Sequence, residues 1–337
     1  ITGGGGNDTF NVDSGTDTVT DLATGDNLVV SSGATATATG IAAFVAASGT
    51  TNAGTATLTA VSSGGTIDLT SAGGSTAYTL VSGAGTDVLK GDDANDTFTI
   101  SAAGEGNNDT IDGDAHSGGS GDTIQLSTGS HTFSTDNKVL NIETIATHSS
   151  GSTVVLTGQT ENFTITGNSG TDIITGGNAV DTVNAGSGND SITGGAGNDI
   201  ITGGSGNDTF NVNTGTDTVT DLSSGDRFIV SSGATMNATD IATFVADSNS
   251  TNSGTANLTA RSAGGTIKMN SAGSGVFNLN SGAGTDTLWG GSGNDIITIA
   301  NATEGNSDTI DGYGGTDILQ LSTGAHTFAT DANLANV

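Results

Sequence analysis

Aspartate recurs every nine residues through the middle of the chain, and this spacing restricts the possible fold more than any other feature. From Gly167 to Ile229 the sequence divides into seven nonapeptides, and a large apolar residue follows each aspartate by two positions. A strict period of nine with Gly-rich turns fits neither a helix nor the alternation of an ordinary strand. It predicts a coil of short strands. The seven aspartates are Asp172, Asp181, Asp190, Asp199, Asp208, Asp217 and Asp226.

The predicted fold is an all-β, parallel β-roll or β-helix, that is, a solenoid. Glycines allow the left-handed backbone of tight turns, and the residues after each turn form a strand with the large side chain pointing inward. Two nonapeptides then make one turn of 18 residues, so alternate aspartates stack on the same edge. Asp172, Asp190, Asp208 and Asp226 are expected on one edge, and Asp181, Asp199 and Asp217 on the other.

Such stacking has a chemical consequence. Neighbouring strands lie about 4.8 Å apart, and two carboxylates at about 5 Å repel by about 3 kcal/mol at an effective dielectric of about 20. A hard divalent cation between the turns would reverse this repulsion and bind turn carbonyls. Calcium suits a flexible, all-oxygen site better than magnesium, which demands tighter geometry. The pattern therefore predicts several bound Ca²⁺ ions and folding coupled to their binding.

Composition agrees with a cation-binding chain. Five Lys and Arg against 35 Asp and Glu give a formal charge of −30, which argues against nucleic acid and anionic membranes as partners. Cysteine is absent, so disulfides and thiolate metal sites are excluded. No apolar stretch is long enough for a membrane span, and Ile1 opens inside a motif, so we expect no membrane insertion and a longer parent chain.

A larger repeat of about 200 residues contains the nonapeptides. The stretch ITGGGGNDTFNV at Ile1 returns as ITGGSGNDTFNV at Ile201. The first unit, 1–200, is expected to hold the end of a nonapeptide block (1–30), a spacer (31–81), a second block (82–126), a strand-rich linker (127–166) and the start of the main block (167–200). The truncated second unit, 201–337, repeats this order as 201–230, 231–280, 281–321 and 322–337.

Each spacer is also expected to contain one short helix. Ile41, Phe44 and Val45, and again Ile241, Phe244 and Val245, would share one helical face.

The nonapeptides resemble the GGxGxDxUx repeat of the RTX (repeats-in-toxin) family, whose parallel β-rolls bind calcium in their turns. The resemblance is strong over 167–229, good over 3–29 and partial over 82–99 and 281–298. Besides the seven central aspartates, it implies the metal-site residues Asp8, Asp17, Asp26, Asp87, Asp96, Asp286, Asp295, Gly4, Gly6, Gly186, Gly188, Gly195, Gly197, Gly204, Gly206, Gly291 and Gly293. Degenerate copies add Asp109, Asp122, Asp308 and Asp317.

A simpler reading competes with metal binding, because Asp and Asn in Gly-rich turns also cap the backbone. Catalysis has little support: the four histidines lie apart and no HExxH motif is present, so no catalytic residue is assigned. The expected function is a structural, calcium-binding protein of a bacterial S-layer or matrix filament, secreted by a type I route. It would self-assemble into a homo-polymer and could contact cell-surface polysaccharide. The alternatives are a stiffened adhesin spacer and the secretion module of an exported toxin or hydrolase.

Overall fold

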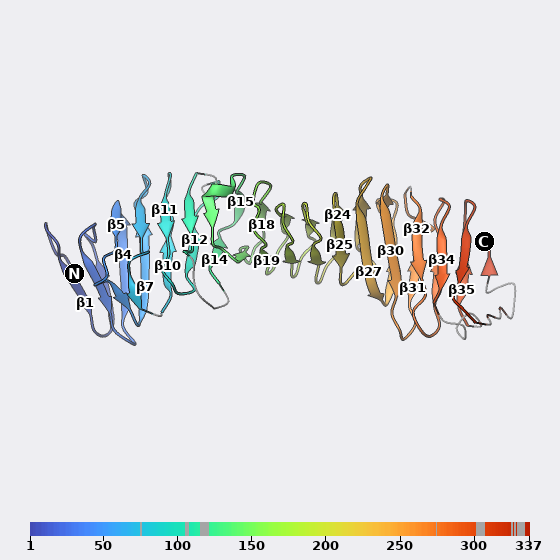
Figure 1. The fold of residues 1–337 in the computed structure, drawn as a ribbon, viewed down its shortest axis with the longest axis horizontal. Helices are drawn as coiled ribbons and strands as arrows, with labels where there is room; N and C mark the ends of the chain where they lie inside the picture. Colours follow the sequence, from blue (N-terminus) through green and yellow to red (C-terminus); the bar gives the residue numbers. More distant parts are fainter. Residues whose placement is uncertain are drawn as a thin grey trace. The chain divides into compact units, whose positions relative to one another are not determined.

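The computed structural model describes residues 1–74, 76–104, 108–114, 121–273, 275–300, 307–324, 326, 328 and 334–337, and almost all of its regular structure is parallel β-strand (Figure 1). The chain forms two compact units, Ile1–Thr166 and Gly167–Val337. The sequence repeat changes at residue 200, so a compact unit does not coincide with a sequence repeat, and the repeat boundaries remain a prediction. No helix in the described ranges is both long and apolar enough to cross a bilayer.

In the first unit, short strands stack in parallel on each side of the coil (Figure 1). The longest stack is β2 (Thr16–Val19), β4 (Thr35–Ile41), β7 (Thr55–Ala60), β10 (Tyr78–Val81), β12 (Thr97–Ile100), β14 (Thr123–Leu126), β17 (Thr144–Ala146) and β19 (Thr164–Thr166). A second stack is β1 (Thr9–Val12), β3 (Asn27–Val30), β6 (Thr51–Asn52) and β9 (Gly73–Gly74). A third is β5 (Ala43–Val45), β8 (Thr66–Asp68), β11 (Val88–Lys90), β13 (Thr110–Asp112) and β16 (Val139–Leu140). β15 (Gly129–Thr132) pairs with β18 (Ser152–Val155), and η1 (Asp136–Lys138) is a 3-10 turn.

The second unit repeats this plan. Its longest stack is β21 (Thr182–Asn184), β23 (Ile200–Thr202), β25 (Thr216–Val219), β27 (Thr235–Ile241), β30 (Thr255–Ala260), β32 (Phe277–Asn280), β34 (Ile296–Ile299) and β36 (Ile318–Leu321). Another is β20 (Ile173–Thr175), β22 (Ser191–Thr193), β24 (Thr209–Val212), β26 (Arg227–Val230) and β29 (Thr251–Asn252). The last is β28 (Thr243–Val245), β31 (Thr266–Lys268), β33 (Thr287–Trp289), β35 (Thr309–Asp311) and β37 (Leu334–Ala335).

The core is built from the apolar residue that follows each aspartate. Ile174 pairs with Ile192, Ile192 with Phe210, and Phe210 with Phe228, each step being 18 residues. All four side chains are fully buried, whereas their strand neighbours face outward. The predicted solenoid and its 18-residue turn are therefore confirmed.

The predicted short helices are wrong. The segments form strands instead: β4 ends at Ile41 and β5 covers Ala43–Val45, and β27 and β28 do the same in the second unit. Ile41 and Phe44 are both buried because the chain turns a corner between two strands, not because they share a helical face. The corner follows a left-handed residue, Gly40 with φ 70° or Asp240 with φ 60°. After it, Ala43–Val45 pairs in parallel with Thr66–Asp68, and Thr243–Val245 with Thr266–Lys268, which a helix cannot do.

Candidate calcium sites

The central aspartates form two ladders, each on one edge of the coil. On the first edge, the backbone N–H of Asp172 donates to Oδ1 of Asp190 at 2.8 Å, and this bond repeats from Asp190 to Asp208 and from Asp208 to Asp226 at 2.9 Å. On the second edge, Asp181 donates to Asp199 at 2.8 Å and Asp199 to Asp217 at 3.1 Å. The structure therefore brings together the aspartates that the nine-residue spacing predicts, in the predicted alternation.

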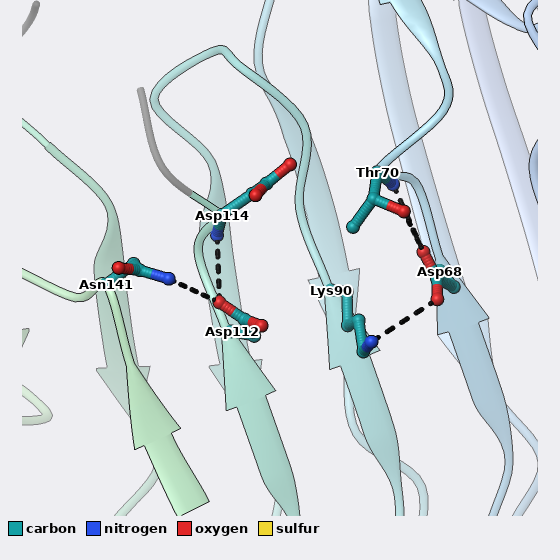
Figure 2. Close-up of polar contacts among 6 residues, drawn as sticks. All are labelled: Asp68, Thr70, Lys90, Asp112, Asp114 and Asn141. Carbon is teal, nitrogen blue, oxygen red and sulfur yellow. Dashed lines mark hydrogen bonds and ion pairs between the residues drawn. The ribbon is translucent and has the colours of Figure 1, made fainter. Parts of the chain in front are cut away.

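These carboxyl groups are buried. Asp199 and Asp217 are 1% and 0% exposed, respectively. Burial raises the pKa of Asp217 to about 7, and burial together with the charges of Asp226 and Asp190 raises the pKa of Asp208 to about 6. The ladder hydrogen bonds lower these pKa values, but by less than burial raises them. The ion pair found among the described residues lies elsewhere, between Lys90 and Asp68 at 3.5 Å (Figure 2).

Several of these carboxylates have one oxygen without a hydrogen-bond partner in the described part of the chain. Oδ2 of Asp190, Asp199 and Asp217 is buried and accepts no hydrogen bond within the described part of the chain. An unpaired buried anion is very costly unless it is protonated or meets a cation. Calcium, an oxygen-seeking divalent cation, fits these atoms. Among the described residues no three acidic or histidine side chains form a metal cluster by themselves, so backbone carbonyls must supply the remaining ligands.

The loops between the ladders supply such carbonyls. Gly206, with φ 143°, stands directly over the carbonyl oxygen of Gly188 one turn earlier, so close that a side chain at 206 would not fit. Gly204 stands in the same way over the carbonyl of Gly186. Glycine is thus required here both for the left-handed backbone and for the close stacking of loops. Pairs of left-handed glycines two residues apart occur at Gly4 and Gly6, Gly186 and Gly188, Gly195 and Gly197, and Gly204 and Gly206.

The loop glycines Gly291 and Gly293 differ from this expectation. Neither adopts a left-handed backbone, although both were assigned to the metal site from the motif. Gly293 still stands close to the carbonyl oxygen of Gly275. This loop therefore keeps the close stacking but not the conformation of the central loops.

The ladders that end at Asp226 and Asp26 do so where a loop satisfies the last carboxylate. Asp226 accepts the N–H of Asp208 through Oδ1, while Oδ2 accepts the N–H and hydroxyl of Ser223 at 2.8 and 3.0 Å. In the first unit Asp26 accepts from Asp8 and Ala23 in the same way, each at 2.9 Å. Asp8 and Asp17 are only half-buried.

The degenerate motifs also form ladders, with longer steps. Asp87 donates to Asp109 and Asp286 to Asp308 at 2.8 Å, each across 22 residues. Asp96 donates to Asp122 across 26 residues at 2.6 Å. In the second unit Asp295 donates to Asp317 across 22 residues at 2.7 Å. Insertions thus lengthen a turn without removing its aspartate from the ladder.

One acidic residue of these ladders was missed by the sequence analysis. Glu143 accepts the N–H of Asp122 through Oε2 at 2.7 Å, and so occupies the next rung in place of an aspartate. The signal was present in the sequence, because Glu143-Thr144-Ile145 repeats the pattern of Asp122-Thr123-Ile124 with the longer acid.

Two equivalent histidines each form a hydrogen bond within a local turn. Nε2 of His131 bonds to the carbonyl oxygen of Ser127 at 3.0 Å, and Nε2 of His326 bonds to that of Ser322 at the same distance. His131 is fully buried, and burial lowers its pKa. Both rings therefore hold the same local turn.

Stacked parallel turns with buried acidic ladders and left-handed glycine loops define a calcium-binding β-roll. The model of the RTX calcium-binding nonapeptide repeat matches the chain at residues 1–19, 73–99, 164–192, 184–219, 278–298 and 303–325. The chain therefore carries several copies of the RTX calcium-binding nonapeptide repeat. No curated protein matches the chain.

Proposed function

We propose that this β-roll is a calcium-binding structural module of a secreted bacterial surface polymer, an S-layer or matrix filament. The observation that carries the calcium part is the burial of Asp190, Asp199 and Asp217, whose Oδ2 atoms have no hydrogen-bond partner among the described residues. Calcium would supply the positive charge between rungs. The chain's own residues orient the carboxylates through the ladder bonds and expose loop carbonyls beside them.

A structural role is supported over a catalytic one because the acidic residues of the motifs form hydrogen-bonded ladders. RTX repeats are typically structural modules without catalytic activity. Self-assembly into a homo-polymer, with cell-surface polysaccharide as a further contact, is proposed because a stack of strands ends in unpaired backbone groups that favour association unless they are covered.

Electron microscopy of the purified chain with calcium and after chelation tests the polymer. Sheets or fibres that form with calcium and dissolve in chelator are the expected result. Single rods at every concentration would contradict the polymer and favour an adhesin spacer. A catalytic domain encoded in the same gene would instead favour the secretion module of an exported enzyme.

A further inference from the structure

One buried carboxylate of the first unit lies outside the nonapeptide pattern. Asp92 stands where the motif has a glycine, and it is 2% exposed. Its N–H donates to Oδ2 of Asp96 at 2.9 Å, and its Oδ1 accepts the N–H of Ala94 at 3.0 Å. The ladder does not use the Asp92 side chain, so its burial needs another explanation.

The second unit contains the same loop without this acid. The N–H groups of Tyr78 and Phe277 donate to Oδ1 of Asp96 and Asp295 at 2.6 and 2.7 Å, which makes the two aromatic residues equivalent. Gly291 is the residue equivalent to Asp92, because each lies four residues before the aspartate whose Oδ2 accepts its N–H. A Cβ added at Gly291 would lie 3.0 Å from Cε2 of Phe277. By this equivalence, the Asp92 side chain starts at the edge of the Tyr78 ring, beside its hydroxyl group.

The Tyr78 hydroxyl supplies a second, independent observation. Tyr78 is 1% exposed, and its Oη has no hydrogen-bond partner within the described ranges. Burial and the charges of Asp92 and Asp96 raise the pKa of Tyr78 above its ordinary value. The oxygen is thus a neutral, buried and unsatisfied ligand atom beside two carboxylates. The pair changes together between the units, from Tyr78 and Asp92 to Phe277 and Gly291.

The surroundings of Asp92 are acidic. Burial, followed by the charges of Asp93 and Asp114, raises its pKa, and the ion pair recorded in the described chain engages Lys90 with Asp68 instead (Figure 2). Figure 2 shows that the neighbouring Asp112 is held by hydrogen bonds from the N–H of Asp114 and the amide of Asn141 and not by a basic side chain. A cation is therefore the missing counter-charge.

We infer that Asp92, Asp96 and the hydroxyl of Tyr78 form an additional calcium site that only the first unit possesses. The inference rests on the proposed calcium binding of the chain. A carboxylate can accept at more than two positions, so Asp96 can bind an ion and keep its two backbone bonds. The carbonyl oxygen of Gly113 lies on the same side of Gly91 as Oδ2 of Asp96 and supplies a further ligand of the kind calcium prefers.

The test compares variants of the full chain by equilibrium dialysis with calcium. Asp92→Asn is expected to lower the number of bound ions by one per chain, whereas Asp93→Asn, which removes an exposed charge next to it, is expected to leave the number unchanged. The double variant Tyr78→Phe, Asp92→Gly copies the residues of the second unit, so it should fold and also lose one ion.

Terbium luminescence gives a second measurement on the same variants. The variants are made in a Trp289→Phe background, which removes the single tryptophan. Excitation of tyrosine should then sensitise luminescence of bound terbium. Asp92→Asn should abolish part of this luminescence, and Tyr78→Phe should abolish the same part. Equal ion numbers and signals in Asp92→Asn and Asp93→Asn, with calcium-dependent folding intact, would overturn the extra site alone. Absence of calcium binding in the unmodified chain would overturn the proposed function as well.

Discussion

At the scale of the residue, the ladder aspartates have two tasks. Oδ1 of Asp199 accepts the backbone N–H of Asp181 in the preceding rung, while its Oδ2 is buried without a partner in the described structure. The capping role and the metal role that compete in the sequence are therefore compatible, because they use different oxygens of one carboxylate.

Asp199→Asn is expected to raise the calcium concentration needed for folding by about tenfold or more. The amide keeps an acceptor for the ladder but loses the charge, and a charge-assisted contact contributes about 1.5–3 kcal/mol, where about 1.4 kcal/mol is tenfold. Circular dichroism at increasing calcium measures the midpoint. The exposed Asp247→Asn is the control, and equal midpoints for the two variants would contradict the assignment.

Gly194→Ala is expected to destabilise the calcium-bound protein by about 1–3 kcal/mol, the usual cost of overpacking. An added Cβ would collide with Oδ2 of Asp199. Gly5→Ala is the matched control, since a Cβ there meets nothing within 4 Å and the backbone is not left-handed. Urea unfolding in calcium compares the two, and equal stability would argue against the placement of that carboxylate.

At the scale of the element, the strands of the main nonapeptide block, three or four residues long, follow from the spacing, whereas the corners of the spacers do not. The sequence was sufficient for the rungs from Asp172 to Asp226, because each aspartate and the apolar residue after it keep a fixed offset. The sequence was insufficient from Ile41 to Val45. There the same spacing of apolar residues is compatible with one face of a helix and with a corner between two strands. The parallel pairing of Ala43–Val45 with Thr66–Asp68, which the sequence does not reveal, makes this segment a corner.

Two further differences between sequence and structure concern the candidate sites. Glu143 takes a rung because its longer side chain still reaches Asp122, which a search for aspartate alone misses. Gly291 matches the motif in sequence but not in backbone conformation, because stacking on the turn before it also shapes this loop.

The left-handed backbone of Asp240, before the strand corner of the second unit, leads to a further prediction. Asp240→Val should destabilise the second unit by about 1–2 kcal/mol, because a left-handed backbone is strained for a side chain branched at Cβ. Asp240→Gly, which copies Gly40 of the first unit, should be at least as stable as the original protein. Thermal unfolding in calcium measures both, and a valine variant as stable as the glycine variant would exclude the left-handed corner.

At the scale of the whole molecule, a charge of −30 and buried acids make folding depend on pH and on calcium together. Burial raises the pKa of Asp96, Asp122 and Asp217 to about 7, well above their ordinary value of 3.8. The folded state therefore binds protons more tightly than the unfolded state, and the stability this provides is lost as pH rises through about 7.

Without calcium, the chain should thus be more stable at pH 5 than at pH 8. With calcium the dependence should weaken or reverse, because protons compete with the ion for the same carboxylates. Circular dichroism at both pH values, in chelator and in excess calcium, compares the amount of β-structure and, where the chain is folded, its thermal unfolding. Higher stability at pH 8 in chelator would contradict the burial of uncompensated acids.

We propose that divalent ions hold successive turns of the coil together. Calcium titration of the full chain at neutral pH, followed by far-ultraviolet circular dichroism, tests this proposal. We expect little ordered structure in chelator and a cooperative gain of β-structure at about millimolar calcium, the range of extracellular sites. The same β-structure in chelator and in calcium would contradict it.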